Sequence, residues 1–444
     1  MTLQDLNALI AEAASQLWGW PMILLLLGTH VYLTVRLRFP QRRIFHAIRL
    51  SVSRDSDGEG DVSQFGALAT SLAATIGTGN IVGVATAVAL GGPGAVFWCW
   101  LTGVLGMATK YSEGLLAVKY RVKTSDGTML GGPMYALERG LGWKSMAVAF
   151  CVLTAIASFG IGNTVQSNAI SMLCAETYGL PPLWTGVATA LLVGLVILFG
   201  VRGIARVCSM FVPLMALCYV LGCIAILCIN GAYVWDALCL ICRSAFNPSA
   251  AGGGFVGTSI MVTARYGIAR GLFSNESGLG SAPIVAAAAQ TRDPVRQALV
   301  SSTATFWDTV VICALTGLVL VSSIIAYPDV DYGSGATLTK MAFEKIPVIG
   351  PSLLTFGIIT FAFSTILGWS YYGERAVEYL SGKRYLILYR VLYVGAVFVG
   401  AIVQLHVVWN VADLLNGLMA IPNLVSLLAL AGVIVAETRQ SADF

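Results

Sequence analysis

Apolar segments of about twenty residues recur along the whole sequence, and each is long enough to cross a bilayer as a helix. Charged residues make up only 11% of the chain and hydrophobic residues 57%, whereas average soluble domains carry roughly a quarter charged residues. The pattern therefore predicts an all-α polytopic membrane protein. The net charge of +4 gives no indication of a nucleic-acid partner, and we expect none.

We predict about eleven transmembrane helices, at residues 17–35, 64–91, 95–118, 146–176, 183–200, 207–229, 254–290 with an interruption, 297–326, 350–380, 386–404 and 410–436. Lysine and arginine gather in connecting segments that we place in the cytoplasm, namely 36–54, 119–144, 202–206, 292–296 and 383–384. Positive charge favours the cytoplasmic side. We therefore expect the N-terminus outside and the C-terminus in the cytoplasm.

The first interruption lies in the span 64–91, where residues 74–83 read ATIGTGNIVG. The spacing GxGxxxG does not match a dinucleotide-binding loop, and no strand precedes it. Gly79 and Gly83 form a GxxxG pair, which favours a helix-packing face as the alternative. That alternative explains the glycines but not the neighbouring Thr75, Thr78 and Asn80.

The second interruption is the stretch ARGLFSNESGLGSAP at residues 269–283. Glycine and proline both weaken a continuous helix, so we expect the helix to break here. Glu276 places a carboxylate inside a span, and such residues are expensive and usually functional. The alternative is a structural acid paired with Arg265 or Arg270.

The two interruptions open two groups of five spans. The first group is 64–229, and the second is 254–404 with the final span at 410–436, while 17–35 is an extra helix. Because five is odd, the second group must enter the membrane from the opposite side, which predicts an inverted repeat. Broken helices at matching positions indicate a transporter site at the midplane, where freed N–H groups suit a carboxylate and freed carbonyls suit a small cation.

Other polar side chains share helix faces inside the predicted spans. Asn163 and Gln166 lie on one face with Phe159. Ser364 and Thr365 offer hard oxygen ligands for sodium, with hydrogen bonding to their own helical turn as the alternative. Trp369 is either a wall of the site or simple packing. Asp308 and Asp413 are secondary candidates.

The segment DSDGEGD at 55–61 resembles a calcium loop in its first seven positions, but the twelfth position is Gly66 rather than a bidentate glutamate. We predict a solvated cytoplasmic linker instead. An enzyme is excluded on inventory, because the three histidines are far apart and neither HExxH nor GxSxG occurs. A channel is disfavoured because the expected symmetry is internal to one chain.

Three long segments, at 58–100, 131–142 and 269–291, resemble the alanine-or-glycine:cation symporter family, within the transporters that share the LeuT-type five-plus-five inverted repeat. The resemblance implies one transporter domain over 1–444, with helix 17–35 outside the ten-helix core. It implies import of a small neutral amino acid, L-alanine or glycine with D-alanine a further candidate, across a bacterial cytoplasmic (inner) membrane. Coupling is to sodium, with proton coupling, exchange or export on the same fold as alternatives.

The resemblance also implies the site. The substrate would contact Thr78, Gly79, Asn80, Phe159, Gln166, Ser274, Asn275, Ser277, Gly278 and Trp369. Sodium would bind Ser364 and Thr365 together with carbonyls near Thr75 and Ile76. Gly77 and Glu276 would have structural or gating roles. The oligomeric state is not predicted.

Overall fold

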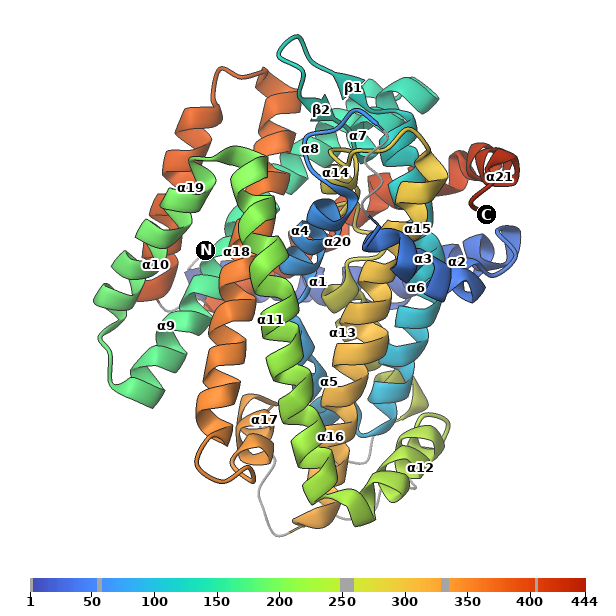
Figure 1. The fold of residues 1–444 in the computed structure, drawn as a ribbon. Helices are drawn as coiled ribbons and strands as arrows, with labels where there is room; N and C mark the ends of the chain where they lie inside the picture. The colour runs from blue at the N-terminus through green and yellow to red at the C-terminus, as the bar shows by residue number, and fades with distance from the viewer. Residues whose placement is uncertain (1–2, 54–57, 248–258, 329–334, 404–405) are drawn as a thin grey trace.

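The computed structural model describes residues 3–53, 58–247, 259–328, 335–403 and 406–444. Within these residues the fold is a bundle of helices (Figure 1) with one two-stranded antiparallel sheet, β1 (Val122–Lys123) and β2 (Met129–Leu130). The sheet lies between α6 and α7, on a connecting segment.

The N-terminal part contains the helices α1 (Leu3–Leu17), α2 (Trp20–Arg36), α3 (Ile44–Ser51), α4 (Gln64–Thr75), α5 (Val84–Gly91), α6 (Gly94–Lys119), α7 (Pro133–Tyr135), α8 (Lys144–Phe159), α9 (Val165–Tyr178), α10 (Pro182–Ile197), α11 (Gly200–Ile229) and α12 (Val234–Ser244). Short 3-10 turns precede α3 and α12, at Pro40–Arg43 and Gly231–Tyr233.

The C-terminal part contains α13 (Ile260–Asn275), α14 (Pro283–Ala286), α15 (Pro294–Thr305), α16 (Ala314–Ala326), α17 (Gly335–Phe343), α18 (Gly350–Ser381), α19 (Leu386–Ile402), α20 (His406–Ala429) and α21 (Ala431–Gln440). In the described ranges, four segments are π-helical, namely η2 (Gly79–Gly83), η3 (Ala136–Gly140), η4 (Gly160–Thr164) and η7 (Phe306–Cys313). Such wide turns inside α-helices are frequent at functional sites.

Six helices among the described residues are long and apolar enough to cross a membrane, namely Asn7–Arg36, Lys144–Tyr178, Gly200–Ile229, Pro294–Ala326, Gly350–Ser381 and Asn410–Ala429. The pair Gln64–Thr75 and Gly79–Gly91, bent by 52°, makes a seventh if it is counted as one span. The chain is therefore a mainly helical, multi-pass membrane protein, as the sequence predicts.

The predicted segments fall on helices of the structure, although 95–118, 183–200 and 386–404 lie on α6, α10 and α19, which are not among these spans, and the last segment, 410–436, is divided between α20 and α21. Residues 254–258 of the predicted segment 254–290, and residue 404, lie outside the described residues. The count of eleven spans and the inverted repeat remain predictions.

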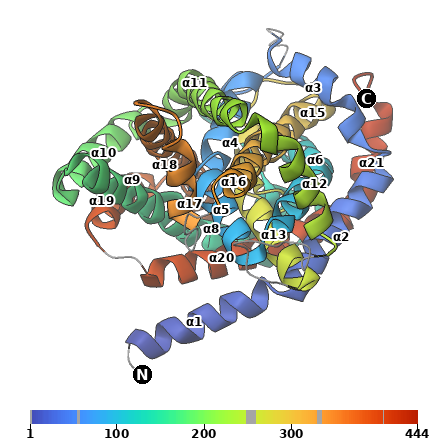
Figure 2. The ribbon, with the colours of Figure 1, turned by 90° about the horizontal axis from the view of Figure 1, so that it is seen from below.

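Two long helices organise the bundle. α6 packs against α13 and α15, and α18 packs against α4, α8, α9 and α11. α10 and α19 lie side by side at one edge, and α1 lies at the rim with its N-terminal end directed away from the bundle (Figures 1 and 2). The two interrupted helices, α4–α5 and α13–α14, therefore lie between α6 and α18.

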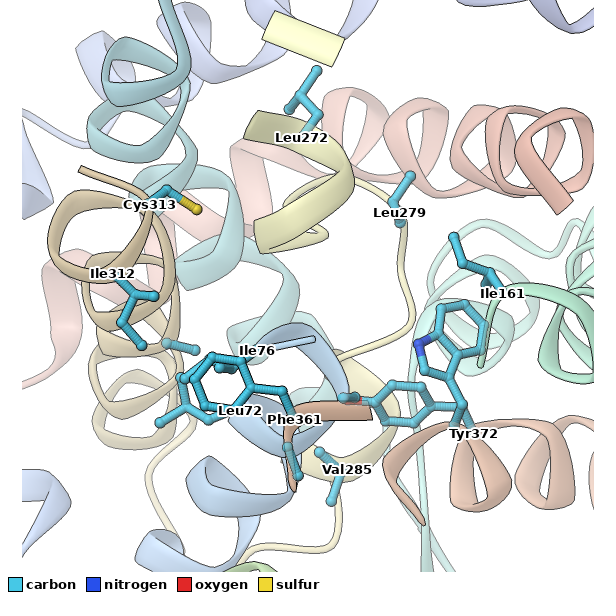
Figure 3. Packing of buried hydrophobic residues seen from close by; sticks show 14 of the residues in the cluster. Leu72, Ile76, Ile161, Leu272, Leu279, Val285, Ile312, Cys313, Phe361 and Tyr372 are labelled. Carbon is cyan, nitrogen blue, oxygen red and sulfur yellow. The ribbon is translucent and has the colours of Figure 1, made fainter. Parts of the chain in front are cut away.

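Apolar side chains fill the space around the interruptions. Leu72 and Ile76 of the first broken helix lie near Phe361 of α18 (Figure 3), and all three are buried. Leu272 lies before the second interruption and Leu279 within it, and both are seen in the same view. Polar groups in this region are thus shielded from solvent, and each one needs a partner.

The linker predicted at 55–61 is partly solvated over 58–61, where Glu59 is exposed and its neighbours are half-buried, but it is also held by backbone contacts, while 54–57 lie outside the described part. The Asp61 N–H donates to the Ala288 carbonyl at 2.8 Å, and the Gln290 N–H donates to the Val62 carbonyl at 2.8 Å. A Cβ atom on Gly60 would come within 2.4 Å of the Gln290 nitrogen. The segment is therefore packed against 287–291, and glycine is needed because the two backbones nearly touch.

Candidate functional site

The first broken helix changes direction at Ile76. α4 ends at Thr75, and Ile76 has an extended backbone conformation with ψ of 94°. The Gly77 N–H donates to the side-chain oxygen of Asn80 at 2.9 Å, so the polar side chain satisfies a backbone group that the break has freed. A Cβ atom on Gly77 would lie 2.7 Å from Thr365 Oγ1. Glycine here permits close approach to α18, which fits a structural role.

The second broken helix unwinds after Asn275. Glu276 has a left-handed conformation with φ of 53°, and Gly278 and Gly280 follow with φ of 95° and 85°. Glycine adopts such angles at little cost, whereas a residue with a side chain is usually held there by its surroundings. Helical structure resumes at Pro283, whose ring suits a first turn. The predicted interruption is present, over residues 276–282.

One buried carboxylate joins the two interruptions. Asp308 of η7 accepts hydrogen bonds from Asn80 Nδ2 at 2.7 Å and from Ser274 Oγ at 2.9 Å, on different oxygens. Thr309 Oγ1 donates to the second oxygen at 2.7 Å. A Cβ atom on Gly79 would lie 3.6 Å from the Ser274 Cα. The predicted residues Gly79, Asn80 and Ser274 are thus brought together around an acid that we ranked as secondary.

Gln166 extends this polar region to α9. Thr78 Oγ1 donates to Gln166 Oε1 at 3.4 Å, and Gln166 Nε2 donates to the Ile161 carbonyl at 3.1 Å. Both side chains are buried. The Ile161 carbonyl lies in η4, where the π-helical turn loosens the regular backbone pattern. The pairing with Thr78 places Gln166 at the first interruption, where it was predicted.

The remaining predicted residues of α13 and its loop also lie in the buried region. Asn275 Oδ1 accepts the Ser277 N–H at 2.9 Å, and Ser277 Oγ lies 3.0 Å from Thr305 Oγ1. Asn275 Nδ2 is a buried donor without a partner among the described residues. Buried donors are usually paired, so this one is a candidate for bonding to a ligand.

Glu276 and Trp369 are partners. The indole Nε1 donates to Glu276 Oε1 at 3.0 Å, and Ser281 Oγ donates to the other oxygen. Arg265 instead contacts Ser15, and Arg270 lies over the ring of Phe273. The alternative in which Glu276 pairs with one of these arginines is therefore wrong, because the acid is held by an indole and a hydroxyl.

Ser364 and Thr365 point from α18 toward the first broken helix. Both hydroxyls lie 3.2 Å from the Ala73 carbonyl, and they also donate to the Phe361 carbonyl at 2.9 and 3.0 Å. Four neutral oxygens thus converge within hydrogen-bonding distance. Neutral oxygens of this kind suit a hard monovalent cation. The hydroxyls bond to their own helical turn as well, as the alternative predicts, and the sodium site stays a prediction.

Three predicted residues have other surroundings. Thr75 Oγ1 donates to the Ser71 carbonyl of its own helix, and the Ile76 N–H donates to the Leu72 carbonyl. The carbonyl that faces the hydroxyl pair is Ala73. Phe159 packs against the rings of Tyr389 and Tyr393 on α19, at centroid distances of 5.4 and 5.6 Å. Its ring contacts therefore lead toward α19.

Two charged residues of α6 were missed. Lys110 Nζ donates to the Asn275 carbonyl at 2.9 Å, and Glu113 Oε1 accepts the Gly278 N–H at 3.0 Å. A lysine and a glutamate one turn apart inside the apolar segment 95–118 are rare, and this pair could have identified α6 as part of the candidate site. Asn423 of α20, which donates to Glu113 at 2.7 Å, carries no comparable signal.

Known proteins are similar to this sequence along nearly its whole length. The model of the sodium:alanine symporter family matches residues 3–443. The chain is 50% identical over 443 residues to the sodium/alanine symporter AgcS of Methanococcus maripaludis, covering 98% of this chain and 97% of that protein. It is 36% identical over 442 residues to the probable sodium/glutamine symporter GlnT of Bacillus subtilis, covering 98% and 91%.

A solved structure shares the fold. MhsT in complex with L-phenylalanine matches with a TM-score of 0.60 and 14% identity, covering 86% of this chain and 93% of that chain. At this identity the likeness shows the fold alone, which is that of LeuT-type transporters. The sequence matches reach further, because the family model and relatives at 36% and 50% identity cover nearly the whole chain. The protein therefore belongs to the sodium:alanine symporter family, a family of transporters rather than enzymes.

Proposed function

We propose that the protein is a secondary active symporter that imports a small neutral amino acid, alanine or glycine, together with sodium. The observation that carries this proposal is the meeting of two broken helices at buried polar groups, with Asp308 bonded to both Asn80 and Ser274. Broken helices that meet at mid-membrane depth are typical of ion-coupled transporter sites. The 50% identical relative is a sodium/alanine symporter by name.

The substrate is proposed to lie between the two interruptions. Free N–H groups of the broken backbone would take the carboxylate of the amino acid, since such groups carry partial positive charge. Asp308 is the anionic group beside Asn80 and Ser274, and it would attract the ammonium. Thr78, Gln166, Ser277 and Gly278 line the same buried region, and Asn275 contributes a donor that still lacks a partner among the described residues.

The size of the substrate is proposed to be limited by Trp369. Its indole is fixed by the bond to Glu276, and the backbone of Gly162 presses against it, because a Cβ atom there would lie 2.2 Å from the Trp369 side chain. A ring held on two sides cannot easily move away from a bulkier ligand. The arrangement favours a hydrogen or methyl side chain, with D-alanine as a further candidate, whereas Phe159 would act from a more distant position.

Sodium is proposed to bind where Ser364 and Thr365 face the first broken helix. The Ala73 carbonyl joins these hydroxyls, and Thr75 and Ile76, the carbonyls predicted from the resemblance, follow directly along the chain. Ordering of the interruption by one ligand would favour the other, a reciprocal coupling of about 1–3 kcal/mol. A membrane potential of about 100 mV adds roughly 2.3 kcal/mol for each sodium that enters.

The wider architecture is part of the proposal. We propose eleven spans in a single domain, with an extra helix at 17–35, a first repeat at 64–229, and an inverted second repeat made of 254–404 together with the last helix at 410–436. The N-terminus would lie outside and the C-terminus in the cytoplasm of a bacterial inner membrane. Rocking of one repeat against the other would expose the site to each side in turn.

Uptake into proteoliposomes tests this function. The purified protein is reconstituted, an inward sodium gradient is imposed, and accumulation of labelled L-alanine is compared with equal sodium on both sides and with protein-free liposomes. We expect accumulation only with the gradient, competed by glycine. A sodium-free arm with an inward proton gradient distinguishes proton coupling, and preloaded alanine distinguishes exchange. No gradient-dependent accumulation of any small amino acid would overturn the proposal.

A further inference from the structure

Helix α6 places two charged side chains beside the unwound segment 276–282. Lys110 and Glu113 stand one helical turn apart, and their exposed fractions are 1% and 2%. Lys110 Nζ donates to the carbonyl of Asn275, the last residue of α13, at 2.9 Å. A cation at the C-terminal end of a helix is favourable, because the last carbonyls have no intrahelical partner.

Glu113 contacts the backbone further along the same segment. Its Oε1 atom accepts the N–H groups of Gly278 at 3.0 Å and Gly280 at 3.1 Å, and also Asn423 Nδ2 at 2.7 Å. Asn423 donates in addition to the Gly278 carbonyl at 2.9 Å. One carboxylate oxygen therefore collects two backbone donors from residues that both have left-handed conformations.

These contacts supply partners for backbone groups that lose their helical hydrogen bonds at the interruption. Backbone N–H groups released by unwinding find no water in an apolar environment, so an unpaired group is strongly unfavourable. Glu113 supplies the acceptor, and Lys110 supplies an opposite charge on the same face of α6. α6 also approaches closely, since a Cβ atom on Gly106 would lie 3.0 Å from Ser277 Oγ.

We propose that Lys110 and Glu113 are positioning residues, which hold segment 275–281 in the unwound shape that presents Ser274 and Ser277 to the site. The inference rests on the proposed function and deepens it. For Glu113, the position of the acceptor oxygen matters more than the negative charge. Loosening the segment would lower the fraction of protein that is ready to bind, and the apparent affinity falls by that fraction.

Two mild substitutions separate the position of the oxygen from its charge. Glu113→Gln removes the charge but keeps an oxygen where Oε1 stands, and its amide takes the place of Oε2, which has no partner among the described residues. Glu113→Asp keeps the charge but withdraws the oxygen by one methylene. Ser112→Ala is the matched control, because the buried Ser112 hydroxyl bonds, within the described part of the chain, only to the Ala108 carbonyl of its own helix.

Two readouts are measured on the full-length protein. Hydrogen exchange of a peptide covering 276–282 is followed in the ligand-free protein in detergent, and KM and maximal rate for alanine are followed in proteoliposomes. We expect Glu113→Asp to speed exchange of this peptide at least tenfold and to raise KM about tenfold with a smaller change in maximal rate. Glu113→Gln and Ser112→Ala should stay within about threefold of wild type in both readouts.

Each other outcome decides against the inference or is resolved by the exchange data. A large change in exchange and KM for Glu113→Gln, with a small change for Glu113→Asp, overturns the inference. The negative charge of Glu113 would then matter more than the position of its oxygen. Two mild variants overturn it as well. If both are severe, faster exchange confined to 276–282 supports positioning, and faster exchange throughout the chain overturns it. If wild type shows no sodium-dependent uptake, the proposed function fails, and the exchange comparison still decides the role of Glu113.

Discussion

Asn80 of the first broken helix and Asp308 of η7 are joined by a hydrogen bond of 2.7 Å from Nδ2 to Oδ1. Ser274 of the second broken helix binds the other oxygen of the same carboxylate. All three side chains are buried, so the acid is surrounded by neutral donors in a medium that strengthens electrostatic attraction. A movement of either broken helix would therefore change a hydrogen bond of Asp308.

Asn80→Ala should impair uptake without preventing membrane insertion. The change removes the donor to Asp308 and the acceptor of the Gly77 N–H. Loss of a hydrogen bond to a charged group costs about 1.5–3 kcal/mol, which corresponds to roughly tenfold or more in uptake efficiency. The measurement is initial uptake rate at equal protein in the membrane. Thr86→Ala is the control, since Thr86 bonds to Val82 of its own helix. Wild-type kinetics in Asn80→Ala would contradict the site.

Asp308→Asn tests whether the carboxylate serves as the negative charge of the site. The substitution keeps the shape and an acceptor oxygen but removes the charge that attracts cationic ligands. We expect the alanine concentration for half-maximal uptake to rise at least tenfold, while hydrogen exchange of the surrounding helices stays close to wild type. Asp236→Asn on α12 provides a control for loss of an acid elsewhere. Equal affinity in Asp308→Asn and wild type would show that the charge is not used.

Thr365→Ala should weaken sodium activation more than it weakens uptake at saturating sodium. It removes one of the oxygens that converge near the Ala73 carbonyl, and we expect the half-activating sodium concentration to rise several-fold. Thr360→Ala on the same helix is the matched control, because among the residues that the structure describes Thr360 Oγ1 bonds only to the Phe356 and Gly357 carbonyls of α18. If sodium activation is unchanged in Thr365→Ala, the cation site lies elsewhere.

The interruptions could be predicted from the sequence because glycine, proline and polar residues within each apolar segment indicate where its helix breaks. Both predicted breaks are present, with non-helical backbone conformations at Ile76 and Glu276. The carbonyl that accepts from Ser364 and Thr365 could not be predicted from the sequence, since every residue has a carbonyl. The change of direction at Ile76, after α4, decides that it is the carbonyl of Ala73. The contacts of Asp308 with Asn80 and Ser274 could not be predicted, because they depend on η7, and one wide turn leaves no clear mark in the sequence.

Other features depend on pairing across the fold. Lys110 and Glu113 were visible as charges in an apolar span, but three of their partners are backbone groups of Asn275, Gly278 and Gly280, which carry no side-chain signature. Phe159 was assigned by its place on a helix face, and the structure directs its ring toward α19. The packing of 58–62 against 287–291 joins segments more than 200 residues apart, so local composition favoured a solvated linker instead.

Trp369→Ala should relax the selectivity for small side chains. The indole is buried and bonded to Glu276, and its removal leaves space where a larger ligand could fit. We expect valine and leucine to compete with labelled alanine at concentrations that leave wild type unaffected. Trp369→Phe separates the two roles of the residue, because it keeps an aromatic wall but loses the bond to Glu276. Unchanged selectivity in Trp369→Ala would indicate that the ring only packs.

Arg121→Gln should loosen the contact between segments 58–62 and 287–291. The guanidinium donates to the carbonyls of Glu59, Ala287, Ala289 and Thr291 at 2.6–3.0 Å. A planar fork with five donors can reach four carbonyls at once, and a glutamine amide cannot. Hydrogen exchange of a peptide covering 286–291 should therefore become at least tenfold faster.

Lys123→Ala is the matched control for that change. Lys123 pairs with the side chain of Glu59 at 2.7 Å, but both side chains are more than half exposed, and exposed ion pairs contribute about 0–1 kcal/mol. We expect its exchange at 286–291 to stay within about threefold of wild type. Equal exchange in the two variants would mean that the backbone bonds of Asp61 and Gln290 hold the segments together without help. The packed segment 58–62 would then owe its position to these backbone bonds rather than to Arg121.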